Sequence, residues 1–174
     1  FFWGRRVTLL VLGLLGISYY FGCNPLRALY KLGWRSHVKW LLIALVWGLI
    51  IGNYSPAQRV SGSLEEVMGL TVFHVIAEEI FFRALLTRLF IDRAKPIFMA
   101  IFLSGLVFGL YHVSYYSWWF DATAWMKIYS LCMVTFFAGF PYAALYYKSG
   151  SMLPPFIAHL TCNVTMMWLS LGNL

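Results

Sequence analysis

The residues that could do chemistry in this chain lie in the stretch "HVIAEEIFFRALL", residues 74 to 86. Two adjacent carboxylates, Glu78 and Glu79, and the guanidinium of Arg83 interrupt a run of Val, Ile, Phe, Leu and Ala. A charged side chain at the centre of a membrane helix costs about 2.5–3.5 kcal/mol on insertion scales. We therefore expect each of these charges to have either a partner or a function.

The two carboxylates are predicted to differ in role. Successive residues of an α-helix point about 100° apart, so Glu78 and Glu79 face different partners. Glu79 and Arg83 are four residues apart with the acid first, which favours an ion pair and gives both a structural explanation. Glu78 has no Lys or Arg three or four residues away in this helix. A carboxylate without such a partner indicates a functional site, unless another helix satisfies it or it stays protonated.

Two later apolar segments carry further polar side chains at helical spacing. The stretch "FGLYH" places Phe108 and His112 four residues apart, and "HLTCN" does the same for His159 and Asn163. Polar side chains in membrane helices normally face one another or water. We therefore expect Glu78, His112, His159 and Asn163 to line a shared polar cavity.

The remaining histidines are interpreted as structural. His37 lies in a basic connection between apolar runs, and His74 could line the cavity without taking part in its chemistry.

The composition predicts the elements that must position these residues. Of 174 residues, 61% are hydrophobic and only 11% are charged, against about 25% charged in an average soluble domain. Several apolar runs approach the roughly 20 residues that cross a bilayer as a helix. The fold class is therefore predicted to be all-α, a polytopic transmembrane bundle of about six membrane helices with the polar site buried between them. The expected helices are about 7–22, 38–52, 64–91, 96–114, 122–147 and 154–171.

Local signals indicate where some of these helices begin and bend. Ser63 and Glu66 form a capping-box pattern at the start of the third helix, and Asp121 could cap the fifth. Gly139 and Pro141 predict a kink within the fifth helix. We expect a single membrane domain over residues 1–174. Its motif-bearing core is 64–171, and residues 1–63 supply two additional N-terminal helices.

Charge and cysteine content exclude several classes of protein. The net charge of +7 comes mainly from Lys and Arg between the apolar runs, the pattern of cytoplasmic loops. A basic face on a soluble fold is not visible, so a nucleic-acid partner is not expected. Three cysteines in or beside apolar segments do not indicate a disulfide framework.

Three motifs, in order and on separate apolar segments, resemble the signature of the CPBP family. The members of this family are the CaaX prenyl-proteases and bacteriocin-processing proteins, and it is also called the Abi family. The resemblance covers about residues 64–171, and the first two helices are compatible with it. The motifs are Glu78-Glu79-x-x-x-Arg83, Phe108-x-x-x-His112 and His159-x-x-x-Asn163.

The resemblance implies a glutamate-dependent intramembrane endopeptidase without a cofactor. By motif position, Glu78 would be the general base that activates a water, and His112 would help to hold that water. His159 and Asn163 would donate hydrogen bonds to the oxyanion of the tetrahedral intermediate.

The remaining motif residues would be supporting ones. Glu79 and Arg83 would keep the ion pair argued above, and Phe108 would wall the cavity. The expected partners are membrane lipid and a peptide or protein substrate, lipidated or membrane-anchored. The expected location is a prokaryotic plasma membrane, with the endoplasmic reticulum membrane as the alternative.

Three other functions stay open at this point. A zinc-dependent membrane protease could use Glu78, His112 and His159, since three protein ligands plus water form the catalytic zinc pattern; no H-E-x-x-H motif is present. A non-catalytic immunity or regulatory scaffold of the same family could use the polar cluster for binding. A proton-coupled transporter would predict two matching halves, and the sequence has no such internal symmetry.

Overall fold

The computed structural model describes residues 2–54, 64–94, 96–119 and 123–171. In these ranges all regular secondary structure is helical, so the predicted all-α fold is confirmed. The elements are α1 (Phe2–Phe21), α2 (Pro25–Lys31), α3 (Val38–Tyr54), α4 (Leu64–Glu79), η1 (Ile80–Thr87), α5 (Arg88–Arg93), α6 (Ile97–Trp119), α7 (Ala124–Met133), η2 (Val134–Gly139), α8 (Phe140–Ser149) and α9 (Leu153–Leu171).

Each expected helix corresponds to observed helical structure. The third is the continuous run of α4, η1 and α5, and the fifth is the run of α7, η2 and α8. The basic connection after α1 contains one more short helix, α2. The side chains of Ser63, Glu66 and Asp121 lie outside the described residues. The N-cap of α7 is Thr123, whose side chain accepts a hydrogen bond from the Met126 amide.

The number of membrane spans is not confirmed. Ala124–Ser149, with 26 residues, is the one helix in the described ranges that is long and apolar enough to cross a bilayer. A second candidate exists if Gly4–Phe21 and Pro25–Lys31, bent by 77°, form one span. Val38–Tyr54 and Ile97–Val113 are shorter apolar helices. The expectation of six spans therefore stays a prediction.

The surface of α3 nevertheless suits a lipid environment. Its exposed face is a continuous array of large aliphatic side chains, an arrangement that is unusual on a monomeric soluble protein. The exposed residues of this face are Leu42, Ile43, Leu45, Val46, Leu49 and Ile50.

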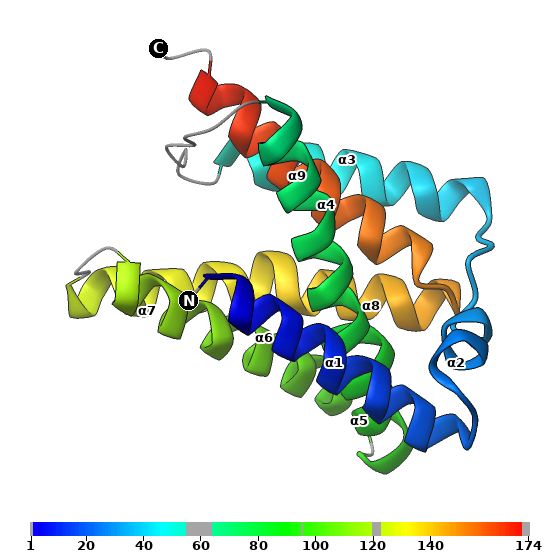
Figure 1. Cartoon of the computed structure of the whole chain (residues 1–174). Coiled ribbons are helices and arrows are strands. Elements are labelled where there is room, and N and C mark those ends of the chain that lie inside the picture. Colours follow the sequence, from blue (N-terminus) through cyan, green and yellow to red (C-terminus); the bar gives the residue numbers. More distant parts are fainter. Residues whose placement is uncertain (1, 55–63, 95, 120–122, 172–174) are drawn as a thin grey trace.

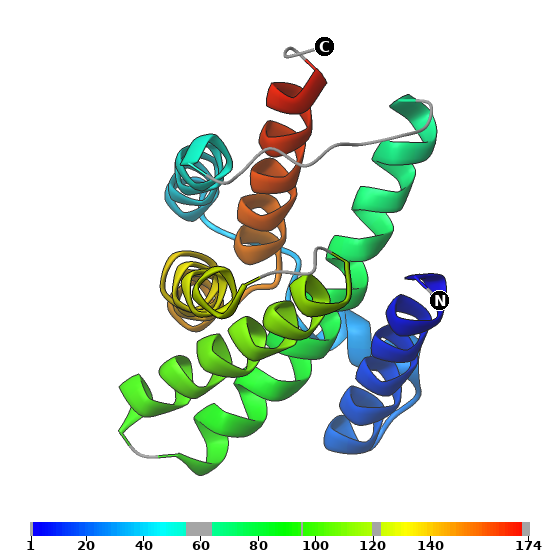
Figure 2. The ribbon, with the colours of Figure 1, turned by 90° about the vertical axis from the view of Figure 1, so that its left-hand side faces the viewer.

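The long helix formed by α4, η1 and α5 is the centre of the arrangement (Figure 1). It contacts α1 along one side and α9 along another, while η1 also meets α6 and α8. Figure 2 shows α6 running beside this helix, and α3 next to α9. Residues in the middle of the central helix can therefore reach α1, α6, α8 and α9.

Small residues allow the helices to approach closely, as in membrane helix pairs generally. Gly48 and Gly52 of α3 lie one turn apart and face α9. A Cβ atom added to Gly48 would lie 2.4 Å from the Ala158 carbonyl oxygen, and one added to Gly52 would lie 2.5 Å from Thr165 Cβ. This contact holds α3 against the helix that carries His159.

Gly105 of α6 and Gly139 of η2 form a similar crossing, which gives a test of the packing. A Cβ on Gly105 would lie 2.7 Å from the Phe140 backbone nitrogen, whereas a Cβ on Gly69 meets nothing within 4 Å. We expect Gly105→Ala to lower the free energy of unfolding by about 1–3 kcal/mol through overpacking. The control Gly69→Ala should be neutral or stabilising by up to about 1 kcal/mol. Thermal unfolding in detergent measures both, and equal stability of the two variants would contradict this packing.

The region of the expected kink is wound as the π-helix η2 and then continues as α8. Pro141 has no amide hydrogen to donate to the carbonyl of Phe137, four residues earlier. Trp47 Nε1 donates to that carbonyl at 2.9 Å. The Phe137 carbonyl lacks its usual α-helical donor because residue 141 is proline. Trp47 of α3 donates to it instead.

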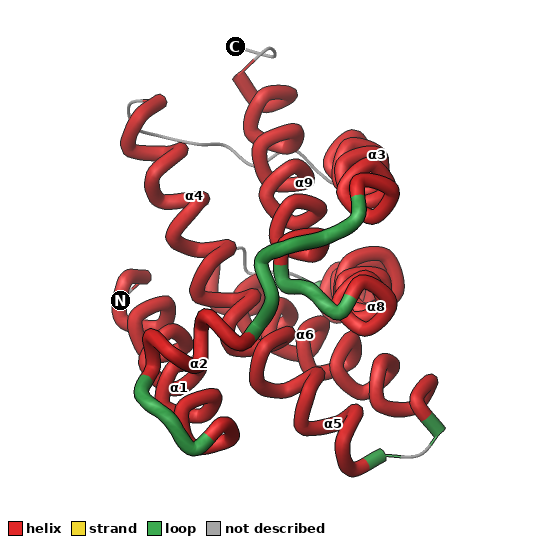
Figure 3. Tube along the Cα trace, turned by 90° about the vertical axis from the view of Figure 1, so that its right-hand side faces the viewer, coloured by secondary structure: helices red, strands yellow, loops and turns green. Residues whose placement is uncertain are grey.

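Two loops at one end of the bundle fix the start of α9 (Figure 3). The Gly33 carbonyl, in the connection between α2 and α3, accepts hydrogen bonds from the Met152 amide at 2.9 Å and from Ser151 Oγ at 2.8 Å. Gly33 and Gly150 have φ of 74° and 63°, a conformation that glycine adopts without strain. The turn that leads to His159 is thereby joined to the N-terminal half.

Candidate active site

The two carboxylates lie at the end of α4, where the central helix changes from α to π winding. Glu78, Glu79 and Arg83 are each at most 1% exposed. π-helical turns inside longer helices are frequent at functional sites. Three charged groups are thus buried in the middle of the central helix, which contacts α1, α6, α8 and α9.

Imidazoles from three helices surround the Glu78 carboxylate. His74 Nε2, from the same helix, lies 3.0 Å from Glu78 Oε1. His112 Nε2 of α6 lies 3.9 Å from Oε2, and His159 Nε2 of α9 lies 3.8 Å from the same oxygen. Within the part of the chain that the structure describes, neither Glu78 oxygen has a partner with the geometry of a hydrogen bond. The structure therefore brings together Glu78, His112 and His159. A shared polar cavity that also includes Asn163 stays a prediction.

The orientation of His112 follows from its other nitrogen. Its Nδ1 lies 2.9 Å from the Phe108 carbonyl oxygen, and because a carbonyl only accepts, Nδ1 is the donor. In the neutral imidazole Nε2 is then an acceptor, and this is the atom that faces Glu78. The Phe108 ring also packs on the His112 ring, with centroids 4.4 Å apart.

The Glu79 carboxylate contacts two side chains, Arg83 and His159. Its Oε2 lies 3.4 Å from Arg83 Nε, so the ion pair predicted from the spacing is formed. Its Oε1 accepts a 2.8 Å hydrogen bond from His159 Nδ1. The Arg83 guanidinium lies 4.2 Å from the Phe108 ring centroid and 5.4 Å from that of Tyr142, and both contacts stabilise a cation. Glu79 therefore orients the His159 ring.

Asn163 is not joined to the cluster. It lies one turn after His159 on α9 and is half-buried, without a hydrogen bond to any side chain in the described ranges. Its expected role as an oxyanion donor stays a prediction.

His74 lies closer to Glu78 than the other imidazoles do. Its Nε2–Oε1 distance of 3.0 Å is the shortest contact of the Glu78 carboxylate with an imidazole, and its interpretation as a residue without a chemical role stays a prediction. Its spacing of four residues from Glu78 is the same signal that predicted Glu79 with Arg83. Glu78 has no Lys or Arg at that spacing, but His74 lies four residues before it. Tyr142, stacked on His159 at 5.4 Å, had no sequence signal.

The zinc alternative stays a prediction. In the ranges that the structure describes, no group of three or more His, Cys, Asp or Glu side chains is arranged to hold a metal ion. The set of Glu78, His112 and His159 is close together, but it does not form such a group.

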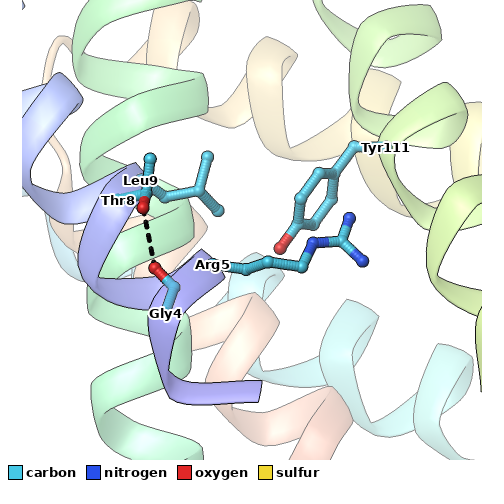
Figure 4. Close-up of a pocket in the computed structure, with 5 residues that line it drawn as sticks. All are labelled: Gly4, Arg5, Thr8, Leu9 and Tyr111. Atoms are coloured by element: carbon cyan, nitrogen blue, oxygen red, sulfur yellow. Dashed lines mark hydrogen bonds between the residues drawn. The ribbon is translucent and has the colours of Figure 1, made fainter. Parts of the chain in front are cut away.

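A pocket of about 420 Å³ lies beside the cluster, between α1 and α6 (Figure 4). Tyr111 forms its wall on the side of the site, and its ring meets that of the neighbouring His112 with centroids 5.3 Å apart. The pocket-lining residues are Gly4, Arg5, Thr8, Leu9 and Tyr111.

A family model described as "Type II CAAX prenyl endopeptidase Rce1-like" matches residues 60–165. This region contains all three motifs. The chain belongs to this family. Rce1-like proteins are membrane proteases, which supports a hydrolase acting on peptide bonds at a membrane. No curated protein and no solved structure matches the chain significantly.

The matched part of this Rce1-like chain begins before α4 and ends within α9. The helices α1, α2 and α3 lie outside it. The buried cluster around Glu78 is therefore built from the family region, whereas the pocket beside it also uses α1.

Proposed function

We propose that this Rce1-like chain is a membrane endopeptidase in which Glu78 and His112 activate a water molecule. The observation that carries the proposal is the 3.9 Å separation between Glu78 Oε2 and His112 Nε2. That distance is too long for a direct hydrogen bond, but polar atoms at such distances are commonly bridged by water. Both atoms are acceptors when the Phe108 carbonyl binds His112 Nδ1.

A water between two acceptors donates one hydrogen to each. Its lone pairs are then free to attack a peptide carbonyl, while Glu78 accepts the proton that the water loses. Proton transfer by a positioned side chain contributes about 10²–10⁴-fold to such reactions. Full burial of Glu78 keeps bulk water from competing for the carboxylate.

His159 and Asn163 are proposed to stabilise the oxyanion. Because His159 Nδ1 donates to Glu79, Nε2 can donate only when the ring is an imidazolium. Glu79 supplies the countercharge for that state through the same 2.8 Å contact. Asn163 would add a neutral amide donor once a substrate carbonyl is present. Loss of one oxyanion donor typically lowers kcat about 10²–10³-fold.

The proposed substrate is a peptide held at the membrane by an attached lipid. The family description specifies CAAX prenyl endopeptidases. In this chain, Phe82, Phe108 and Tyr111 form an aromatic group beside the cluster, with Phe82–Phe108 and Phe82–Tyr111 centroids 5.0 and 5.2 Å apart. Of these three, Tyr111 also lines the neighbouring pocket, and an apolar surface next to the reacting groups suits a lipidated segment.

The experiment that tests the function uses the purified chain in detergent. Its substrates are S-prenylated and unmodified forms of one fluorogenic peptide. We expect hydrolysis of the prenylated form with the lower KM, and no change in rate with a zinc chelator. Loss of activity on chelation and its return with zinc would support the metalloprotease instead. Binding of the peptide with no turnover of either form would support the scaffold.

His74 provides a further test of the site. If its contact with Glu78 holds the carboxylate in position, His74→Leu should lower kcat about tenfold, the equivalent of roughly 1.4 kcal/mol. His74→Gln, which retains a side-chain donor, should recover part of the loss. The two variants are compared at equal concentrations of folded protein. A wild-type kcat for His74→Leu would show that this imidazole is only a filler of space.

A further inference from the structure

The pocket between α1 and α6 has the character of a ligand site. Its volume of about 420 Å³ lies in the range of roughly 300–1,000 Å³ that is usual for small-molecule sites. Leu9 and the Tyr111 ring supply apolar walls, and the Arg5 guanidinium lies over that ring, 5.0 Å from its centroid. Such sites combine apolar walls with a few polar groups that fix orientation.

Tyr111 connects this pocket to the proposed catalytic cluster. Figure 4 shows its hydroxyl pointing toward the Arg5 side chain. The Tyr111 ring also lies against the ring of His112, with centroids 5.3 Å apart, and His112 Nε2 lies 3.9 Å from Glu78 Oε2. Tyr111 thus contacts Arg5 in the pocket and His112 in the cluster.

We propose that this pocket binds a carboxylate of the peptide substrate and that Arg5 determines this preference. The inference rests on the proposed endopeptidase function, and names a subsite for it. The guanidinium matches a carboxylate with two parallel hydrogen bonds. A carboxylate bound at Arg5 would fix the direction in which the peptide lies beside the cluster.

The subsite can be tested by binding, so that catalysis is not required. The protein is the Glu78→Gln variant in nanodiscs of zwitterionic lipid. The probe is one fluorescent S-prenylated peptide with either a free C-terminal carboxylate or a carboxamide. We expect the carboxylate form to bind about tenfold more tightly, the size of one charge-assisted hydrogen-bond contact.

Arginine variants assign that difference to a residue. Arg5→Gln should bring the Kd of the carboxylate peptide to that of the carboxamide, and Arg5→Lys should keep part of the difference. Arg93→Gln, at an exposed position at the end of α5, is the matched control and should keep all of it. Equal Kd values for the two peptides with Arg5 present would overturn the inference. The proposed function is tested independently of the subsite: it would be contradicted if the wild type did not hydrolyse the peptide.

A second variant tests the location. Gly4 lines the pocket, and a Cβ added there meets nothing within 4 Å. Gly4→Trp should therefore fill the space and weaken binding of the carboxylate peptide at least tenfold, while Gly69→Trp, equally unobstructed at its Cβ, should not. Unchanged binding by Gly4→Trp would overturn the assignment. Arg5-dependent loss of peptide binding in phosphatidylglycerol nanodiscs, but not in zwitterionic ones, would also overturn it, since that result would assign the pocket to an anionic lipid headgroup.

Discussion

Replacing Glu78 by glutamine is expected to lower the single-turnover rate of peptide hydrolysis by about 10²–10⁴-fold. Glutamine retains the shape of the side chain but cannot accept the proton that the attacking water loses. The carboxylate is fully buried, with its Oε2 3.9 and 3.8 Å from two imidazoles. Rates are measured with excess folded protein over a prenylated fluorogenic peptide, so that product release does not limit them.

Thermal stability separates this effect from unfolding. Neutralising a buried charge removes an energetic cost, so the Tm of Glu78→Gln in detergent should equal or exceed that of the wild type. Glu79→Gln is the adjacent control. It should lower Tm because the buried Arg83 loses its countercharge. A Glu78→Gln variant within tenfold of the wild-type rate would contradict the assigned base.

The second large effect is expected from Arg83→Met. Arg83 is fully buried, with its Nε 3.4 Å from Glu79 Oε2. Methionine fills the space between the rings of Phe108 and Tyr142 without a charge, and leaves Glu79 buried with only His159. Breaking one half of a buried pair typically costs about 3–5 kcal/mol. We expect a loss of that size in the free energy of unfolding, measured by denaturant titration in detergent.

The double variant gives the control for this prediction. Glu79→Gln combined with Arg83→Met removes both charges, and apolar or neutral replacements of a whole pair are often close to neutral. The double variant should therefore be more stable than Arg83→Met alone. A double variant as unstable as the sum of the two singles would show that the two side chains do not depend on each other.

What the sequence could predict was local. Spacing within one helix identified the Glu79–Arg83 contact, because four residues of helix place two side chains on one face. His74 and Glu78 have the same spacing, but spacing alone does not tell whether a histidine contacts the acid or only lies near it. The 3.0 Å distance between His74 Nε2 and Glu78 Oε1 shows that it makes contact.

Contacts between distant segments were beyond such reasoning. His159 is 80 residues from the Glu79 carboxylate to which it donates, and no periodicity within either helix predicts that pairing. The motif resemblance placed His159 in the site without identifying this partner. The pocket combines α1 with Tyr111, and the π winding after Glu79 depends on packing against several neighbours. These features follow from the tertiary arrangement and not from local propensity.

The most direct measurement is a double-mutant cycle of Glu78→Gln and His112→Ala in the single-turnover assay. Two groups that hold the same water act as a unit, and such groups are strongly non-additive. The double variant should be no slower than the slower of the two single variants, within about threefold. Rate losses that multiply in the double variant would show that residues 78 and 112 act on different steps, and would contradict a shared water between them.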